Sequence, residues 1–235
     1  MFVKEPLRIC NASSTLSGVQ EASSFLAPVL ESGSHCADFV ERIAGVATTT
    51  DKEETLARLA PHHAAAAQSL GFEKTFYAEQ VHGAEVSVIT KHSPPVTLGV
   101  DGLISKECVL LGIHVADCGG LYLLDRKNGA IGLLHSGKKG TESNITGKAV
   151  QAMHKNFGTC PGDLAVVLAP CIRPPHYEID FAKIIREQAL TAGVSSDNYH
   201  DCGLCTASDL RRFYSYRREK GNTGRLLALL GRQSS

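Results

Sequence analysis

The stretch that decides the fold is Val109–Gly140, with the sequence VLLGIHVADCGGLYLLDRKNGAIGLLHSGKKG. It holds three short apolar runs separated by Gly, Asp and Asn, and such runs predict strands: Val109–Val115, Leu121–Asp125 and Ala130–Leu134. Cys118 and His135 stand just after or at the end of an apolar run, beside small or turn residues. We therefore expect an open site at the strand ends rather than a core.

Outside this stretch, further short apolar runs predict strands at Val86–Thr90, Gly99–Ser105 and Leu164–Leu168. Residues 1 to about 50 are weakly patterned and indicate short strands and loops. Helical spacing and capping residues predict helices from Asp51 to Leu59, interrupted at Pro61, and then at His62–Leu70, Glu142–Phe157, Asp180–Ala192 and Ser208–Lys220. Strands in the middle with helices on the flanks predict an α+β fold, a mixed β-sheet sandwich flanked by helices, as a single domain over residues 1–235.

Composition excludes several classes of protein. The formal net charge of the 235 residues is zero, so no global field favours nucleic acid or a membrane surface. No apolar run approaches the roughly 20 residues that span a bilayer. Eight cysteines without an apolar export signal indicate reduced thiols, and hence a cytoplasmic protein. We expect a monomer or a small homo-oligomer.

A thiol and two imidazoles are the candidate chemical groups. His82 in EQVHG, Cys118 in VADCGG and His135 in LLHSGKKG can together hold a metal and leave one position open, as catalytic zinc sites do. Their spacing matches no local zinc-finger pattern, so the fold must assemble such a site. The alternatives are that Cys118 is a small core residue and that His135 is a hydrogen-bonded structural residue.

Three further segments carry a functional and a plainer interpretation. Lys138 and Lys139, between Gly137 and Gly140, suit an anion such as phosphate, or they lie on a solvated turn. For Cys202 and Cys205 in CGLC, packing is favoured over a redox pair or half of a metal site. The segment RRFYSYRREKGNTGR resembles a platform for single-stranded nucleic acid, but the favoured interpretation is an amphipathic helix that packs Phe213, Tyr214 and Tyr216.

The chain also carries an ordered set of short motifs. In sequence order they are Gln80–Gly83, Asp101-Gly102, Ala116–Cys118 with Leu121–Asp125, His135–Gly140, Ala169–Ile172 with Tyr177–Ile179, Phe213–Arg218, and Gly224-Arg225. Over about residues 77–230 this set resembles the multicopper polyphenol oxidase (laccase-domain) family, also described as purine nucleoside phosphorylases and as peptidoglycan editing factor-like proteins. Each motif is weak alone, but the ordered set is specific.

The resemblance implies that His82, Cys118 and His135 are the catalytic residues and hold Zn²⁺, with copper the less favoured alternative because a laccase needs many more histidines. It implies phosphorolysis of adenosine, inosine and methylthioadenosine, with some adenosine deamination, acting on a small-molecule nucleoside and phosphate. We expect substrate to contact Gln80, Asp117, Lys138, Lys139 and Arg217, although Asp117 can equally orient a metal ligand or shape a turn.

Departures from the family pattern keep alternatives open. Lys138-Lys139 replaces Trp-Arg of HAGWRG, the N-terminal STRxGGVS-like motif is degraded to Ser14–Val19, and the first 50 residues are divergent. One alternative is a metal-free hydrolase or amidase with Cys118 as nucleophile and His135 as base. Peptidoglycan precursors are a candidate substrate for it. The other is a binding protein that has kept the three metal-capable residues and lost the substrate pocket.

Overall fold

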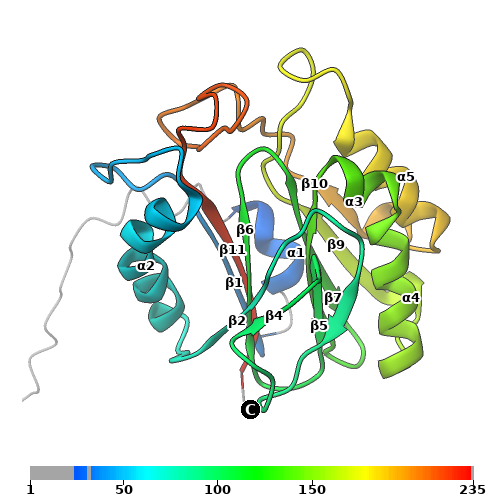
Figure 1. Cartoon of the computed structure of the whole chain (residues 1–235). Helices are drawn as coiled ribbons and strands as arrows, with labels where there is room; N and C mark the ends of the chain where they lie inside the picture. The colour runs from blue at the N-terminus through cyan, green and yellow to red at the C-terminus, as the bar shows by residue number, and fades with distance from the viewer. Residues whose placement is uncertain (1–23, 31–32, 234–235) are drawn as a thin grey trace, which may run out of the picture.

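Two mixed β-sheets pack face to face in the middle of the molecule (Figure 1). The computed structural model describes residues 24–30 and 33–233. In spatial order the first sheet contains β1 (His35–Val40), β11 (Leu226–Arg232), β6 (Leu110–Val115), β2 (Thr75–Ala78) and β4 (Val96–Thr97). The second contains β10 (Tyr199–Asp201), β9 (Leu164–Leu168), β7 (Gly119–Asp125), β8 (Ile131–Ser136), β5 (Gly102–Ser105) and β3 (Val86–Val88).

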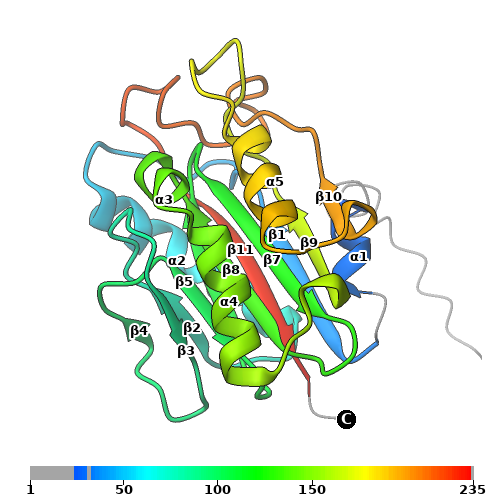
Figure 2. The same cartoon turned by 90° about the vertical axis from the view of Figure 1, so that its right-hand side faces the viewer.

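Helices cover the outer faces of both sheets. In Figure 1, α2 (Lys52–Ser69) lies on the left, and α3 (Lys138–Glu142), α4 (Ile145–Phe157) and α5 (Phe181–Thr191) lie on the right. Figure 2 shows α4 and α5 running across the second sheet, while α1 (Ala27–Leu30) packs beside β1 and β9. Short 3-10 turns occupy Ser24–Leu26, Pro161–Asp163 and Ser196–Asn198. Within residues 24–30 and 33–233, no helix has both the length and the hydropathy to cross a membrane.

Alternation along the central strands builds three apolar layers. In β6, Leu111, Ile113 and Val115 point between the two sheets, whereas Leu110 joins Ala67 of α2 on the outer face. In β7, Tyr122 and Leu124 point between the sheets, and Leu121 and Leu123 point to the helices on the other side. Because both faces of these strands are buried, most of their residues are apolar, with His114 in β6 and Asp125 in β7 as the exceptions.

The predicted fold class is confirmed, a mixed β-sandwich flanked by helices. All six predicted strands exist, and Leu164–Leu168 has the predicted bounds. The structure continues β8 to Ser136, so His135 lies within the strand. The helix predicted at Asp180–Ala192 is α5, with the Asp180 side chain accepting from the Lys183 N–H as its N-terminal cap.

The predicted break at Pro61 is wrong, because α2 runs unbroken from Lys52 to Ser69. Four buried residues at a spacing of four lie on both sides of the proline: Thr55, Leu59, His63 and Ala67. Pro61 itself is exposed, so its missing N–H and its ring fall on the solvent side. The buried stripe therefore outweighs the local cost of the proline.

The helix predicted at Glu142–Phe157 begins later, at Ile145. Asn144 separates it from α3, with a left-handed backbone (φ 59°) and a side-chain oxygen that accepts from the Gly147 N–H. Gly158 ends α4, as predicted. The SGKKG segment is therefore the junction between β8, which ends at Ser136, and the short helix α3, which begins at Lys138, rather than a loop.

The helix predicted at Ser208–Lys220 is wrong, because this segment consists of turns. The consecutive residues Phe213, Tyr214 and Ser215 are all buried, which one face of a helix cannot achieve. Glu219 fixes a turn by accepting from the Ser215 N–H. Tyr216, predicted to pack, is exposed.

Four strands were not predicted, namely β2, β4, β10 and β11. The largest omission is β11, a continuous apolar run that periodicity alone cannot distinguish from a helix. In the N-terminal region, β1 agrees with the expected short strands. The degraded motif at Ser14–Val19 lies outside the described residues.

Candidate metal centre and its cavity

The candidate site lies where the chain crosses between the two sheets. Cys118 separates β6 of the first sheet from β7 of the second, and His82 lies in the connection from β2 to β3, which makes the same crossing. His135 reaches this end on β8, where it pairs with Gly120. The backbones of His82 (φ 61°) and Asp117 (φ 83°) are left-handed, so the turns that present these side chains are strained.

His82, Cys118 and His135 converge, with one ligand atom of each lying within 4.8 Å of the others. The two imidazole rings are 4.9 Å apart between centroids and meet edge to face at 83°. His135 is buried, Cys118 is partly exposed and His82 is exposed. The cluster therefore has a closed side within the sandwich and an open side.

Asp101 ties two of these groups together. Its carboxylate accepts a hydrogen bond from His135 Nδ1 at 2.7 Å, from the His82 N–H at 3.0 Å and from the Gly83 N–H at 2.7 Å. Because Nδ1 donates to Asp101, Nε2 is the ring nitrogen of His135 that is left for a metal. Asp101 was predicted only as part of its motif, although an aspartate directly before a buried strand was the available signal.

Charge strongly couples Cys118 and His135. Burial opposes a thiolate, but His135 and His82 outweigh it and lower the pKa of Cys118 to about 6. Burial also opposes an imidazolium, but Cys118 and Asp101 raise the pKa of His135 to about 9. Burial likewise opposes the Asp101 carboxylate, yet its hydrogen bonds from His135 and from the backbone lower its pKa overall. The coupling therefore favours a thiolate on Cys118 and, as long as no metal takes Nε2, an imidazolium on His135.

The surroundings fit a metal ion. A Cβ on Gly137 would lie 3.0 Å from Cys118 Sγ and 3.2 Å from His82 Cδ2, so only glycine leaves the cluster clear. A Cβ on Gly140 would lie 2.6 Å from the carbonyl oxygen of Gly83, so α3 packs directly against the His82 turn. Two imidazole nitrogens and a thiolate are the donors that zinc prefers.

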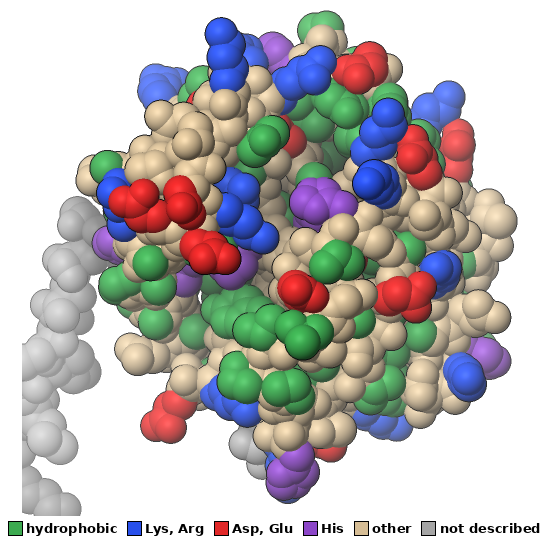
Figure 3. Space-filling view, viewed as in Figure 1, with side chains coloured by type: hydrophobic (Ala, Val, Ile, Leu, Met, Phe, Trp, Pro, Cys, Tyr) green, Lys and Arg blue, Asp and Glu red, His purple; other side chains and the backbone are tan. Residues whose placement is uncertain are grey.

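The open side of the cluster faces a cavity of about 620 Å³. Four of the five residues predicted to contact substrate line it: Gln80, Asp117, Lys138 and Arg217. Lys139, the fifth, is exposed and does not line it. Nine other lining residues were not predicted to contact substrate: Lys52, His114, Ala116, Ile172, Tyr177, Phe181, Tyr216, Lys220 and Arg225. Basic side chains and a histidine surround the hollow on the upper part of the face in Figure 3.

Two of the lining residues are already engaged. The Gln80 amide donates to the His114 carbonyl at 2.6 Å and accepts from the His114 N–H at 2.9 Å, so it fastens the turn before His82 to β6. The Asp117 carboxylate accepts from Thr206 Oγ1 and from the Arg217 N–H, both at 2.7 Å. Both side chains shape the cavity wall through these bonds, and their contact with substrate stays a prediction.

The family described as multi-copper polyphenol oxidoreductase laccase matches residues 43–181 and 176–233. The chain belongs to this laccase family. It is 30% identical to "Purine nucleoside phosphorylase YlmD" of Geobacillus stearothermophilus over 200 residues, covering 68% of this chain and 73% of that protein. It is 32% identical to "Purine nucleoside phosphorylase" of Deinococcus radiodurans over 208 residues, covering 77% and 80%.

A solved structure of a laccase-family protein has the same fold. The crystal structure of YlmD from Geobacillus stearothermophilus superposes with a TM-score of 0.76 at 26% identity, covering 86% of this chain and 93% of that one. Despite the multi-copper name, His82, Cys118 and His135 form the one metal-capable group in the described part of this chain. Cys202 and Cys205 do not belong to it, and burial raises the pKa of Cys202 to about 11.

Proposed function

We propose that this laccase-family protein is a zinc-dependent purine nucleoside phosphorylase. Its substrates would be adenosine, inosine or methylthioadenosine together with phosphate, and its products the free base and the sugar 1-phosphate. The observation that carries the proposal is the cluster of His82, Cys118 and His135, which forms the floor of the cavity. The other lining residues, called the rim below, include Lys52, His114, Lys138, Arg217, Lys220 and Arg225. The names of the relatives support the same reaction.

The cavity suits the two proposed substrates in size and charge. A volume of about 620 Å³ is in the range of small-molecule sites. Tyr177 and Phe181 offer stacked rings, with centroids 5.2 Å apart, for a flat purine. Lys138 brings a positive charge over the floor of the cavity, where phosphate or a departing base carries negative charge.

In this proposal His82, Cys118 and His135 would hold the zinc ion. A bound Zn²⁺ would supply Lewis acidity and local positive charge at the floor of the cavity. Asp101 keeps His135 in the tautomer with Nε2 free, and fixes the His82 turn through two backbone N–H groups. Gly137 keeps the floor clear of side chains.

The test is the phosphate dependence of product formation. Purified protein is incubated with each nucleoside, with and without phosphate, and the products are separated by chromatography. Phosphate-dependent adenine from adenosine supports the phosphorylase. Inosine formed from adenosine without phosphate would support an adenosine deaminase activity. Intact nucleosides under all conditions would contradict the proposal and favour a binding role.

A second candidate rests on the thiolate–imidazolium pair. A Cys118 thiolate beside His135 is also the arrangement of a cysteine hydrolase or amidase. Zinc content and chelation distinguish the two reactions. Loss of activity on chelation, with recovery on adding zinc, supports the phosphorylase. Activity that survives chelation but not alkylation of Cys118 supports the hydrolase.

A further inference from the structure

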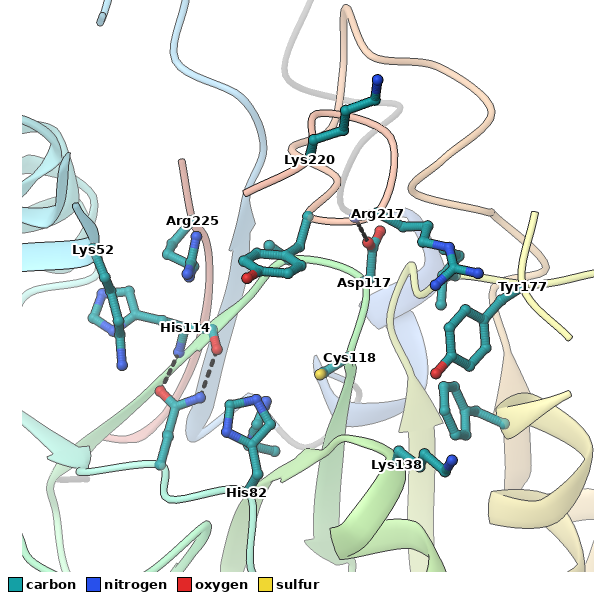
Figure 4. Close-up of a pocket in the computed structure, with 16 residues that line it drawn as sticks. Lys52, His82, His114, Asp117, Cys118, Lys138, Tyr177, Arg217, Lys220 and Arg225 are labelled. Carbon is teal, nitrogen blue, oxygen red and sulfur yellow. Dashed lines mark hydrogen bonds between the residues drawn. The ribbon is translucent and has the colours of Figure 1, made fainter. Parts of the chain in front are cut away.

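The cavity has two chemically different walls on either side of the metal-capable cluster. Figure 4 shows Lys52, His114 and Arg225 on one side, Tyr177 on the other, and His82 and Cys118 between them. Phe181 stacks on Tyr177 and lines the same cavity. Arg217 lies over the Tyr177 ring, 5.2 Å from its centroid, and pairs with Glu178, and Lys138 lies on the same side as Tyr177. The first wall therefore carries basic groups, whereas the second carries two aromatic rings together with Arg217 and Lys138.

Arg225 is the central group of the basic wall. Its Nη1 donates to the carbonyl oxygens of Thr223 and Gly224, at 3.4 and 2.8 Å, which fixes the guanidinium beside the cavity. The side chain is half-buried, and no carboxylate among the described residues pairs with it. By contrast, Arg42 pairs with Glu219 at 2.7 Å and Arg173 pairs with Asp201. Cys118 and Asp117 favour the charged guanidinium without an ion pair to it, and burial outweighs them and lowers the pKa of Arg225. A half-buried guanidinium without a direct ion pair is costly, which argues for an anionic ligand.

Lys52 and His114 complete this wall. Lys52, the first residue of α2, lines the cavity and makes no hydrogen bond or ion pair with the described residues. His114 is on β6, and its ring lies 5.3 Å from that of His63 on α2 and 5.2 Å from that of Tyr77 on β2. Burial together with His63, Lys52 and Arg225 lowers the pKa of His114 to about 3, so it is neutral. Asp117 is the one carboxylate that lines the cavity, and it is engaged by Thr206 and Arg217. The basic wall thus has two positive charges and no negative one.

We propose that Lys52, His114 and Arg225 bind inorganic phosphate, and that the purine base lies against Tyr177 and Phe181. This assignment rests on the proposed phosphorylase function. Arg225 would offer its free N–H groups in a fork that matches two phosphate oxygens, and Lys52 would add a point charge. The ribose would lie between the walls, above His82 and Cys118.

The chemistry of phosphorolysis requires such a separation. A phosphate oxygen forms a bond to C1′ of the sugar while the bond from C1′ to the purine nitrogen breaks, and its electron pair leaves with the base. The proton of hydrogen phosphate ends on the base nitrogen, so that nucleoside and hydrogen phosphate give neutral base and sugar phosphate. The entering and leaving groups occupy opposite faces of C1′, and opposite walls can hold them in that geometry.

The kinetic test varies nucleoside and phosphate independently in three variants. Lys52→Ala should raise the KM for phosphate about tenfold and change the KM for nucleoside less than about twofold, as expected for one lost charged hydrogen bond. Tyr177→Leu should raise the KM for nucleoside and leave the KM for phosphate nearly unchanged. Lys139→Ala is the matched control, because Lys139 is exposed and does not line the cavity, and both KM values should stay unchanged. If Lys52→Ala raises the KM for nucleoside instead, or neither KM, the assignment is wrong.

A binding measurement separates this assignment from the proposed function. Calorimetry with inorganic phosphate alone should give an affinity about tenfold weaker in Lys52→Ala than in the wild type or Lys139→Ala. If phosphate binds with this pattern but no nucleoside is cleaved, the subsite is supported and the phosphorylase proposal fails. If nucleosides are cleaved but Lys52→Ala binds phosphate normally, the function is supported and the subsite is wrong. Arg225→Lys keeps the charge but loses the fork, so its affinity for phosphate should lie between those of the wild type and Lys52→Ala. Melting temperatures equal to that of the wild type would show that the variants are folded.

Discussion

The floor and the rim of the cavity differ in how far their polar groups are already satisfied. At the floor, Asp101 receives three hydrogen bonds and thereby fixes both His135 and the His82 turn. At the rim, Lys138 and Lys220 face the cavity without an ion pair to the described residues. The hydrogen bonds at the floor are formed without a ligand, whereas the lysines at the rim remain able to pair with an anionic ligand. A change at the floor should therefore cost far more than a change at the rim.

The largest effect is expected for Cys118→Ala, which removes the only anionic ligand of the cluster. We expect loss of stoichiometric zinc and a fall in kcat/KM of at least about a thousandfold, equivalent to roughly 4 kcal/mol of transition-state stabilisation. Metal analysis and nucleoside kinetics measure the two effects. Cys160→Ala is the control, because Cys160 is an exposed free cysteine and should leave both unchanged. Full activity in Cys118→Ala would show that the reaction does not need the cluster of His82, Cys118 and His135.

Asp101→Asn should come next, because it leaves the ligands in place and disturbs only what holds them. One amide oxygen cannot satisfy His135 Nδ1–H and the N–H groups of His82 and Gly83, so at least one donor is left unpaired. We expect zinc affinity to fall about 10- to 100-fold, as for other groups that orient metal ligands. We also expect the free energy of unfolding to fall by about 1–3 kcal/mol. Unchanged zinc affinity, measured by competition with a chelator, would mean that the floor is not organised through Asp101.

How much of this could be read from the sequence differs between floor and rim as well. Cys118 and His135 stand at the ends of the strongest apolar runs, so the sequence indicated both the strands and the residues that the strands present. His82 was found through its motif. Asp101 was given no role because its three partners lie at positions 82, 83 and 135, which come together only through the pairing of β5 with β3 on one side and with β8 on the other.

The rim was much less predictable. Lys52 comes from the start of α2 and Arg225 from the residue before β11, and the sequence analysis did not predict β11. The side chain of His114 looked like part of an apolar strand. Lys138 and Lys139 are adjacent and chemically identical, and only the start of α3 decides that Lys138 lines the cavity and Lys139 does not. Local spacing can predict a residue at a strand end, but it cannot predict which separate segments share a wall.

The acidity of Cys118 offers a third test of the floor. In protein freed of metal by a chelator, the rate of alkylation of Cys118 should rise through a midpoint near pH 6 rather than near the pH of about 8.5 of an ordinary cysteine. The sign follows from His135, which favours the thiolate while it is an imidazolium. In Asp101→Asn the imidazolium is less favoured, so the midpoint should move to higher pH. Mass spectrometry of the alkylated peptide measures the rate, and a midpoint near 8.5 in the wild type would show that the two groups are not coupled.

The smallest effect is expected at the rim, for Lys138→Ala. Lys138 is exposed as well as facing the cavity, so solvent screens its charge and a single contact to an anionic group contributes about 1 kcal/mol. We therefore expect kcat/KM to fall only about 3- to 10-fold, with zinc content unchanged. Lys139→Ala, one residue further along the same helix, should have no measurable effect because its side chain does not line the cavity. Raising the salt concentration should bring the kcat/KM values of the wild type and Lys138→Ala closer together, because salt screens the charge that the substitution removes. A fall in kcat/KM for Lys138→Ala as large as that for Asp101→Asn would mean that Lys138 matters as much as the residues at the floor. Equal falls for Lys138→Ala and Lys139→Ala would contradict the difference in how α3 presents the two side chains to the cavity.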